Sequence, residues 1–106
     1  MPKYLSTGSY TPEGLRGLHH EGASARRAAL EKLAESAGGK LEEFYLAFGE
    51  NDFYFVFDFP DNVAAAAASM IANASGAIHS HLVVLLTAEE IDEASRRTPQ
   101  YRAPHE

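Results

Sequence analysis

The segment from residue 49 to residue 61, GENDFYFVFDFPD, constrains the fold more than any other part of the chain. The Gly, Asn and Asp at its start favour a turn, because Gly and Asn tolerate positive φ and Asp bonds its own local backbone. Residues 53–59 are apolar and aromatic apart from one aspartate, which is typical of a short strand. Pro60 has no N–H to donate to a sheet, and Asp61 is placed to cap a helix. The segment therefore predicts a turn, a strand and a helix start.

A second strand is expected over residues 40–48, joined to this one by a tight loop. We expect a hairpin whose strands pair in the register that places the large apolar side chains on one face, because that face can then be buried. The expected pairs are Phe48–Phe53, Leu46–Phe55 and Phe44–Phe57 on one face, and Ala47–Tyr54, Tyr45–Val56 and Glu43–Asp58 on the other.

Caps and periodicity predict the other elements. The expected order is a strand over 3–10, a helix over 12–37 with a break near Gly22, the hairpin, a helix over 62–75, a strand over 77–86 and a short helix over 87–97. Thr87 and Glu90 resemble a capping box that opens the last helix. The core stripe of the 62–75 helix is expected to comprise Val63, Ala67, Met70, Ile71 and Ala74.

This order, βαββαβ, is the ferredoxin-like pattern of an α+β fold with a four-stranded antiparallel sheet. We expect one domain over residues 1–97 and an extended tail over 98–106. Both helices should cover the aromatic face of the hairpin. The other face carries Tyr45, Tyr54 and Val56, which are too apolar to face water. A homodimer with two facing sheets, a dimeric α/β barrel, would cover it, and a ligand could share the space.

Composition limits the classes of partner. The net charge is −6 and no basic cluster exceeds the pairs Arg26-Arg27 and Arg96-Arg97, so we expect no nucleic acid partner. The chain has no cysteine, which removes disulfides, thiolate metal sites and a thiol nucleophile. No signal peptide or apolar run of membrane-spanning length is visible, so we expect a cytoplasmic protein with no membrane partner.

Several short motifs together resemble those of the GYD domain family. They are Phe44-Tyr45, Gly49-Glu50-Asn51-Asp52, Pro60-Asp61, Thr11-Pro12-Glu13-Gly14, Gly38-Gly39, and Gly76 with Thr87-Ala88-Glu89-Glu90. The resemblance covers about residues 4–90 and implies a dimeric α/β barrel related to small monooxygenase-like and muconolactone-isomerase-like proteins. Asn51 stands where the Gly-Tyr-Asp pattern expects Tyr, which removes an aromatic ring at the turn. The resemblance implies no particular activity, because one fold hosts many functions.

Two groups of titratable residues are candidates for chemistry. His79 and His81 are two residues apart and so share one face of a strand, where they could chelate a metal if a third ligand converged. The simpler interpretation is that both are partly exposed strand histidines or line the dimer cavity without metal, and we expect no metal or other cofactor. Glu43 and Asp58 would face each other across the hairpin, an arrangement suited to a general acid–base or a cation site. The simpler alternative is that Glu43 lies near the edge of the sheet and turns into solvent, or pairs with Lys40 or an arginine.

Tyrosines form a third group. Tyr4, Tyr10, Tyr45 and Tyr54 could orient a small ligand through their hydroxyl groups, or fill an interface. The expected ligand-binding residues are Tyr45, Tyr54, Val56, Asp58, His79 and His81. The sequence thus predicts a homodimer that binds a small organic molecule between facing sheets. The alternative is a cofactor-independent monooxygenase-like or isomerase-like enzyme with Asp58 or a strand histidine as acid–base.

Overall fold

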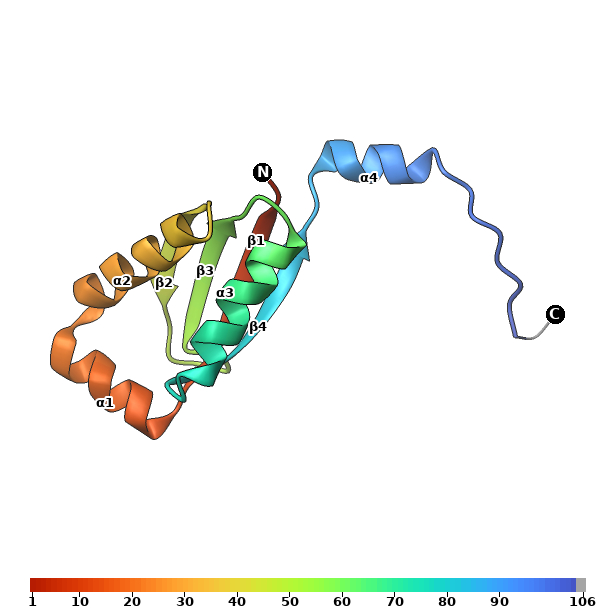
Figure 1. Ribbon diagram of the computed structural model, residues 1–106. Helices are drawn as coiled ribbons and strands as arrows, with labels where there is room; N and C mark the ends of the chain where they lie inside the picture. Colours follow the sequence, from red (N-terminus) through yellow and green to blue (C-terminus); the bar gives the residue numbers. More distant parts are fainter. Residues whose placement is uncertain (105–106) are drawn as a thin grey trace.

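A computed structural model of the protein describes residues 1–104 (Figure 1). The elements are β1 (Lys3–Tyr10), α1 (Pro12–Glu21), α2 (Ala23–Ser36), β2 (Lys40–Leu46), β3 (Phe53–Asp58), α3 (Asn62–Ala74), β4 (Ile78–Leu85) and α4 (Ala88–Ser95). The strands form one antiparallel sheet in the order β2-β3-β1-β4. The predicted α+β fold is confirmed, and the predicted helix break lies at Gly22, where φ is 90°. Part of the predicted tail, residues 105–106, lies outside the described residues.

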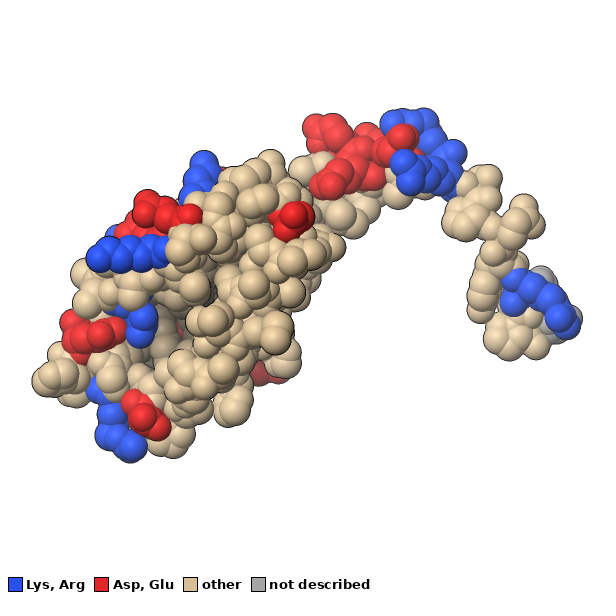
Figure 2. All heavy atoms as spheres, viewed as in Figure 1, with Lys and Arg blue, Asp and Glu red and all other residues tan. Residues whose placement is uncertain are grey.

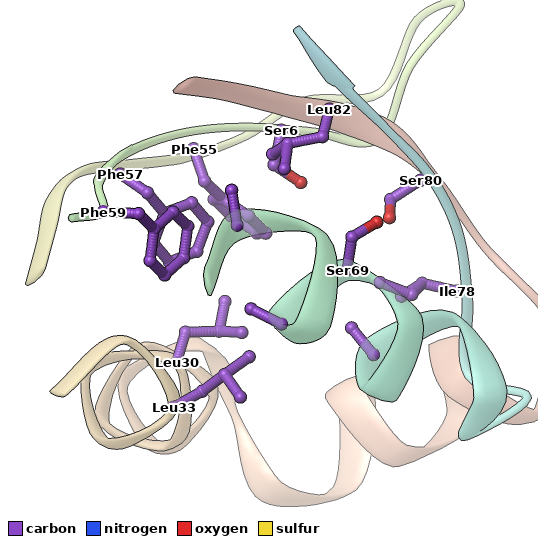
Figure 3. Close-up of a pocket in the computed structure, with 13 residues that line it drawn as sticks. Ser6, Leu30, Leu33, Phe55, Phe57, Phe59, Ser69, Ile78, Ser80 and Leu82 are labelled. Atoms are coloured by element: carbon purple, nitrogen blue, oxygen red, sulfur yellow. The ribbon is translucent and has the colours of Figure 1, made fainter. Parts of the chain in front are cut away.

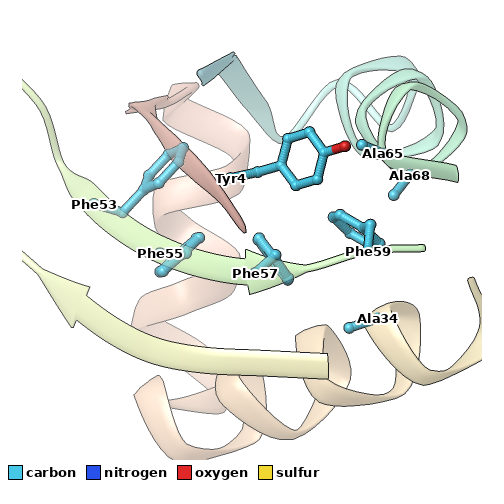
Figure 4. Packing of buried hydrophobic residues seen from close by; sticks show 8 residues of the cluster. All are labelled: Tyr4, Ala34, Phe53, Phe55, Phe57, Phe59, Ala65 and Ala68. Carbon is cyan, nitrogen blue, oxygen red and sulfur yellow. The ribbon is translucent and has the colours of Figure 1, made fainter. Parts of the chain in front are cut away.

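The core lies between one face of the sheet and the helices α2 and α3, which lie on the same side of it (Figures 1 and 4). Phe53, Phe55 and Phe57 alternate along β3 and are at most 5% exposed, because every second side chain of a strand points to the same face. The rings of Phe53 and Phe55 stack with their centroids 4.7 Å apart. Phe44 stacks on Phe55 from β2 at 4.8 Å. This confirms that the aromatic face is the buried one.

Helix α3 turns two of its alanines, Ala65 and Ala68, toward the sheet. Ala65 and Ala68 are buried at 2% and 7% exposure, whereas Val63, Met70 and Ile71 are 67–78% exposed. The predicted core stripe of this helix is therefore wrong. Hydrophobicity alone favoured the large residues, but small side chains allow a helix to lie close on the large aromatic rings of the sheet.

The hairpin register also differs from the prediction. β2 ends at Leu46, two positions before Phe48, and the observed pairs are Leu46–Phe53, Tyr45–Tyr54, Phe44–Phe55 and Glu43–Val56. Because the shift is by two residues, each side chain keeps its predicted face. Phe48 instead lies in the loop between β2 and β3 and is fully exposed.

A β-bulge between Leu41 and Glu43 then changes the pairing at the start of β2. Beyond it, Leu41 pairs with Phe57 and Lys40 pairs with Asp58. The predicted pair of Glu43 with Asp58 is therefore wrong: the partner of Glu43 is Val56. Nothing in the alternation of the sequence marks the extra residue, because a bulge inserts one position into one strand alone.

Candidate functional site

The face of the sheet that points away from the helices is the candidate site, and we call it the open face. Register places its side chains as Lys40, Glu43 and Tyr45 on β2, Tyr54, Val56 and Asp58 on β3, Lys3, Leu5, Thr7 and Ser9 on β1, and His79, His81, Val83 and Leu85 on β4. The predicted catalytic and ligand-binding residues therefore share one surface, but Glu43 and Asp58 are not paired with each other.

The middle of the open face is apolar. Leu5 on β1 lies between Val56 on β3 and Val83 on β4. In the next row, Thr7 lies between Tyr54 and His81. No element within residues 1–104 covers this surface: Val83 is 45% exposed and Tyr54 is 40% exposed. Contiguous apolar surface of this kind marks an interface or a binding site.

An ionic cluster occupies the end of the open face where β3 ends. Lys3 Nζ donates to Asp58 Oδ1 at 2.9 Å and to Glu42 Oε2 at 2.7 Å. Lys40 Nζ lies 3.8 Å from Asp58 Oδ2 and 3.7 Å from Glu42 Oε1. Glu42, the residue at the bulge, thus takes the place beside Asp58 that the sequence assigned to Glu43. Two lysines and two carboxylates balance one another here, so the cluster has no net charge.

Asp58 is buried, with 8% of its side chain exposed, even though it lies on the open face. Burial on its own would raise the pKa of this carboxyl, but the hydrogen bond from Lys3 and the nearby charge of Lys40 outweigh it and hold the pKa below its ordinary value. The hydrogen bonds to Glu42 and Asp58 in turn raise the pKa of Lys3. Asp58 is therefore a charged ion-pair partner and a weaker base than an ordinary aspartate.

We expect Asp58→Asn to lower the free energy of unfolding by about 1 to 2 kcal/mol at pH 7, because it removes a charge-assisted hydrogen bond. Because the pKa of Asp58 is lower in the folded state than in the unfolded state, its carboxylate stabilises the fold at pH values above the ordinary aspartate pKa. This contribution is lost as the pH falls through the lowered pKa. Urea unfolding of both proteins between pH 7 and pH 2 should show the difference shrink below about pH 5. Glu50→Gln, at an exposed position, is the control. If the loss of unfolding free energy in Asp58→Asn is the same at every pH, the result contradicts this account.

His79 and His81 lie side by side along the edge strand β4 and are both exposed. Register places His81 beside Thr7 and His79 beside Ser9, so hydroxyl groups are their neighbours on β1. Within residues 1–104, no group of three or more His, Asp or Glu side chains is gathered in a way that could hold a metal ion. The histidines are therefore described best as polar groups at one edge of the open face.

The four tyrosines divide between the two faces. Tyr45 and Tyr54 are paired neighbours on the open face, and Tyr45 is 63% exposed. Tyr4 lies in the core at 1% exposure, where its hydroxyl donates to Asn62 Oδ1 at 2.6 Å. The ring of Tyr10 packs edge-on against Phe53, on the helix side. Tyr4 and Tyr10 are therefore structural, and their suggested place in a ligand site is wrong.

Sequence reasoning missed the contribution of β1 to the open face. Lys3, Leu5 and Thr7 alternate with the buried Tyr4 and Ser6, which is the period-two signal of a strand with one covered face. That alternation could have placed them opposite the helices. It could not have shown that β1 is a central strand, between β3 and β4, because strand order is not visible in local pattern.

The space enclosed between the helices and the sheet offers little room for a ligand. A narrow cleft between α2 and α3 has Phe55, Phe57 and Leu82 among its lining residues (Figure 3). Its volume is about 30 Å³, which suits a water molecule and not an organic compound. This cleft is therefore not a candidate site for an organic ligand.

The turn between β2 and β3 is tied to β1 by Asp52. Its N–H donates to the Gly8 carbonyl at 2.7 Å, and its Oδ2 accepts from the Tyr10 N–H at 2.9 Å. Asn51, at the position of the missing aromatic ring, donates from Nδ2 to the Tyr54 hydroxyl at 3.3 Å.

Residues 4–95 match the GYD domain, from β1 to the end of α4. The chain belongs to the GYD domain family. Within this GYD domain, Asp52 has a structural role, because its two hydrogen bonds hold the turn against β1.

Comparisons with curated proteins and with solved structures gave no match. Among the described residues, no helix is both long enough and apolar enough to cross a membrane.

Proposed function

We propose that this GYD domain forms a homodimer in which the open faces of two sheets pack together and bind a small organic molecule between them. The observation that carries the proposal is the uncovered apolar surface formed by Leu5, Val56 and Val83. A second copy supplies a surface of the same kind, which is how symmetric dimers cover a self-complementary patch.

The sizes of the side chains on the open face favour a hollow interface. Leu5, Val56 and Val83 form a row of medium-sized side chains, whereas the next row across the sheet carries the larger groups Tyr45, Tyr54 and His81. Facing sheets pack about 10 Å apart. Contact through the row of larger side chains, with shorter side chains beside it, leaves space for a ligand over Leu5, Val56 and Val83.

The groups around this space define the class of ligand. Leu5, Val56 and Val83 suit an apolar body. The hydroxyl of Tyr54 and the imidazole of His81 supply hydrogen bonds on one side, where a carbonyl or hydroxyl of the ligand would lie. A small organic molecule with an apolar skeleton and one or two oxygen atoms fits this description, in keeping with the usual composition of ligand sites.

Binding is favoured over acid–base catalysis by the state of Asp58. Lys3 and Lys40 hold its carboxylate in the charged form, and its lowered pKa makes it a poor proton acceptor at neutral pH. Among the predicted acid–base groups, Glu43, His79 and His81 have no such ion pair in the described structure. A turnover reaction would therefore have to use one of these three residues.

Val56→Trp tests the ligand part of the proposal, because a large ring at the centre of the open face would fill the space without adding charge. We expect the wild-type protein, denatured and extracted with organic solvent, to release one small molecule per dimer. Mass spectrometry of the extract should show this molecule lost from Val56→Trp, while light scattering still gives the mass of a dimer. Equal amounts of the molecule from both proteins, or none from the wild type, would contradict the proposal.

A further inference from the structure

One row of side chains crosses all four strands on the open face, and it borders the proposed ligand space. Its members are Tyr45 on β2, Tyr54 on β3, Thr7 on β1 and His81 on β4. Charged side chains gather elsewhere, over α1, α2 and α4 in Figure 2 and in the ionic cluster at the other end of the open face. The polar groups of this row are hydroxyls and an imidazole, so its recognition of a ligand depends on which of them donate and which accept hydrogen bonds.

The hydroxyl group of Tyr54 is held as a hydrogen-bond donor. Asn51 Nδ2 lies 3.3 Å from the hydroxyl oxygen of Tyr54. An amide nitrogen can only donate, so this oxygen is the acceptor and the hydroxyl hydrogen takes no part in the bond. Within residues 1–104 that hydrogen has no acceptor, and the Tyr54 side chain is 40% exposed. The hydrogen is therefore available to an acceptor atom of a ligand.

Thr7, the neighbour of Tyr54 on β1, is held in the opposite sense. Its Oγ1 donates to the carbonyl of Phe53 at 2.9 Å. A carbonyl can only accept, so the single hydroxyl hydrogen of Thr7 is committed to this bond. Thr7 therefore offers a ligand only the lone pairs of its oxygen, and a donor and an acceptor of fixed direction stand on neighbouring strands.

The outer members of the row have no fixed direction. Tyr45 and His81 make no hydrogen bond to any other residue in the part of the chain that the structure describes. A phenol and a neutral imidazole can each donate or accept, so these two groups adapt to the ligand. Discrimination between ligands therefore depends on Tyr54 and Thr7.

We propose that Asn51 is a positioning residue, which orients the Tyr54 hydroxyl so that the site selects a ligand with a carbonyl oxygen at Tyr54 and a hydroxyl group at Thr7. This inference rests on the proposed function, because it needs a ligand between the facing sheets. It narrows the ligand class to hydroxylated ketones or aldehydes with an apolar body. A ligand with a donor at Tyr54 would leave two hydrogens opposed and unpaired, which lowers its affinity.

Two probes that differ only at the carbonyl test the ligand class. They are para-hydroxyacetophenone and para-ethylphenol, in which a methylene group replaces the carbonyl. Titration of the full-length protein, followed by NMR, gives the Kd of each probe, and a copurified molecule competes equally with both. We expect the preference for the ketone, the ratio of the two Kd values, to be about fivefold higher in the wild type than in Tyr54→Phe. Thr7→Val should weaken both probes by a similar factor, because both carry the hydroxyl, and leave the preference unchanged.

Asn51→Asp tests the positioning role, because a carboxylate can only accept and so takes the hydrogen of the Tyr54 hydroxyl. We expect the ketone preference of Asn51→Asp to fall to that of Tyr54→Phe. Adding Asn51→Asp to Tyr54→Phe should change the preference no further, which controls for the added charge and shows that Asn51 acts through Tyr54. Neither residue is buried, so all of these variants should keep the circular dichroism spectrum of the wild type.

The other outcomes overturn the inference. A wild-type preference in Asn51→Asp, or an equal change when Tyr54→Phe is already present, would remove the positioning role. A wild-type preference no higher than that of Tyr54→Phe, no saturable binding of either probe, or unchanged affinities in Thr7→Val would remove the ligand class. Light scattering and solvent extraction of the wild type separate these failures from that of the proposed function. A dimer that releases a small molecule retains the proposed function, whereas a monomer or an empty extract removes both.

Discussion

Phe55→Ala should lower the free energy of unfolding by about 3 to 5 kcal/mol, because it removes a buried ring and leaves a cavity. Phe55 is 4% exposed and stacks on Phe44 and Phe53 from two sides. A domain of this size has a total stability of about 5 to 15 kcal/mol. The variant should therefore unfold at a much lower urea concentration than the wild type, as followed by circular dichroism.

Phe48→Ala is the matched control, since Phe48 is fully exposed on the loop after β2. A change at an exposed site of this kind is expected to stay within about 0.5 kcal/mol. Similar losses from the two variants would contradict the observed register, because the predicted hairpin placed Phe48 in the core beside Phe53.

Val83→Asp is the second variant with a large expected effect. Val83 lies on the open face beside Leu5 and is 45% exposed within one chain, so the substitution should leave the monomer folded. In the proposed dimer, symmetry brings two new carboxylates into an apolar interface, where they lose hydration and repel each other. We expect a cost of about 3 kcal/mol, which weakens association about 100-fold.

Sedimentation velocity over a range of protein concentrations measures this change. Ala28→Asp, an exposed substitution on α2, is the control and should leave the dimer intact. Unchanged association of Val83→Asp would mean that the open face is not the dimer interface. Loss of the circular dichroism signal of the folded state would instead mean that Val83 supports the monomer, and Tyr45→Asp at the other edge of the same face then provides the test of association.

The sequence predicts the order of elements well, because caps and turns are local signals. Asp61 and Thr87 cap α3 and α4, and Gly22 separates α1 from α2, all as predicted. The faces of the strands were also predictable, since a period of two survives even a register shift of two residues. The open face with its tyrosines and histidines follows from that alternation.

What the sequence could not predict depends on packing between elements. The bulge at Glu42 has no signature in the alternation, so the sequence wrongly placed Glu43 beside Asp58. Hydrophobicity suggested that Met70 faces the core, but the residues of α3 that are buried against the sheet are Ala65 and Ala68. Met70 and Ile71 instead point outward and are exposed.

Native mass spectrometry of the freshly purified protein, compared with its denatured mass, tests the central claim most directly. The proposed function predicts a dimer whose mass exceeds twice the chain mass by that of one small organic molecule, and collisional activation should release this molecule. A monomer at micromolar concentration would contradict the facing-sheet dimer and leave the apolar surface of Leu5, Val56 and Val83 in water. A dimer without excess mass would retain the interface and contradict ligand binding.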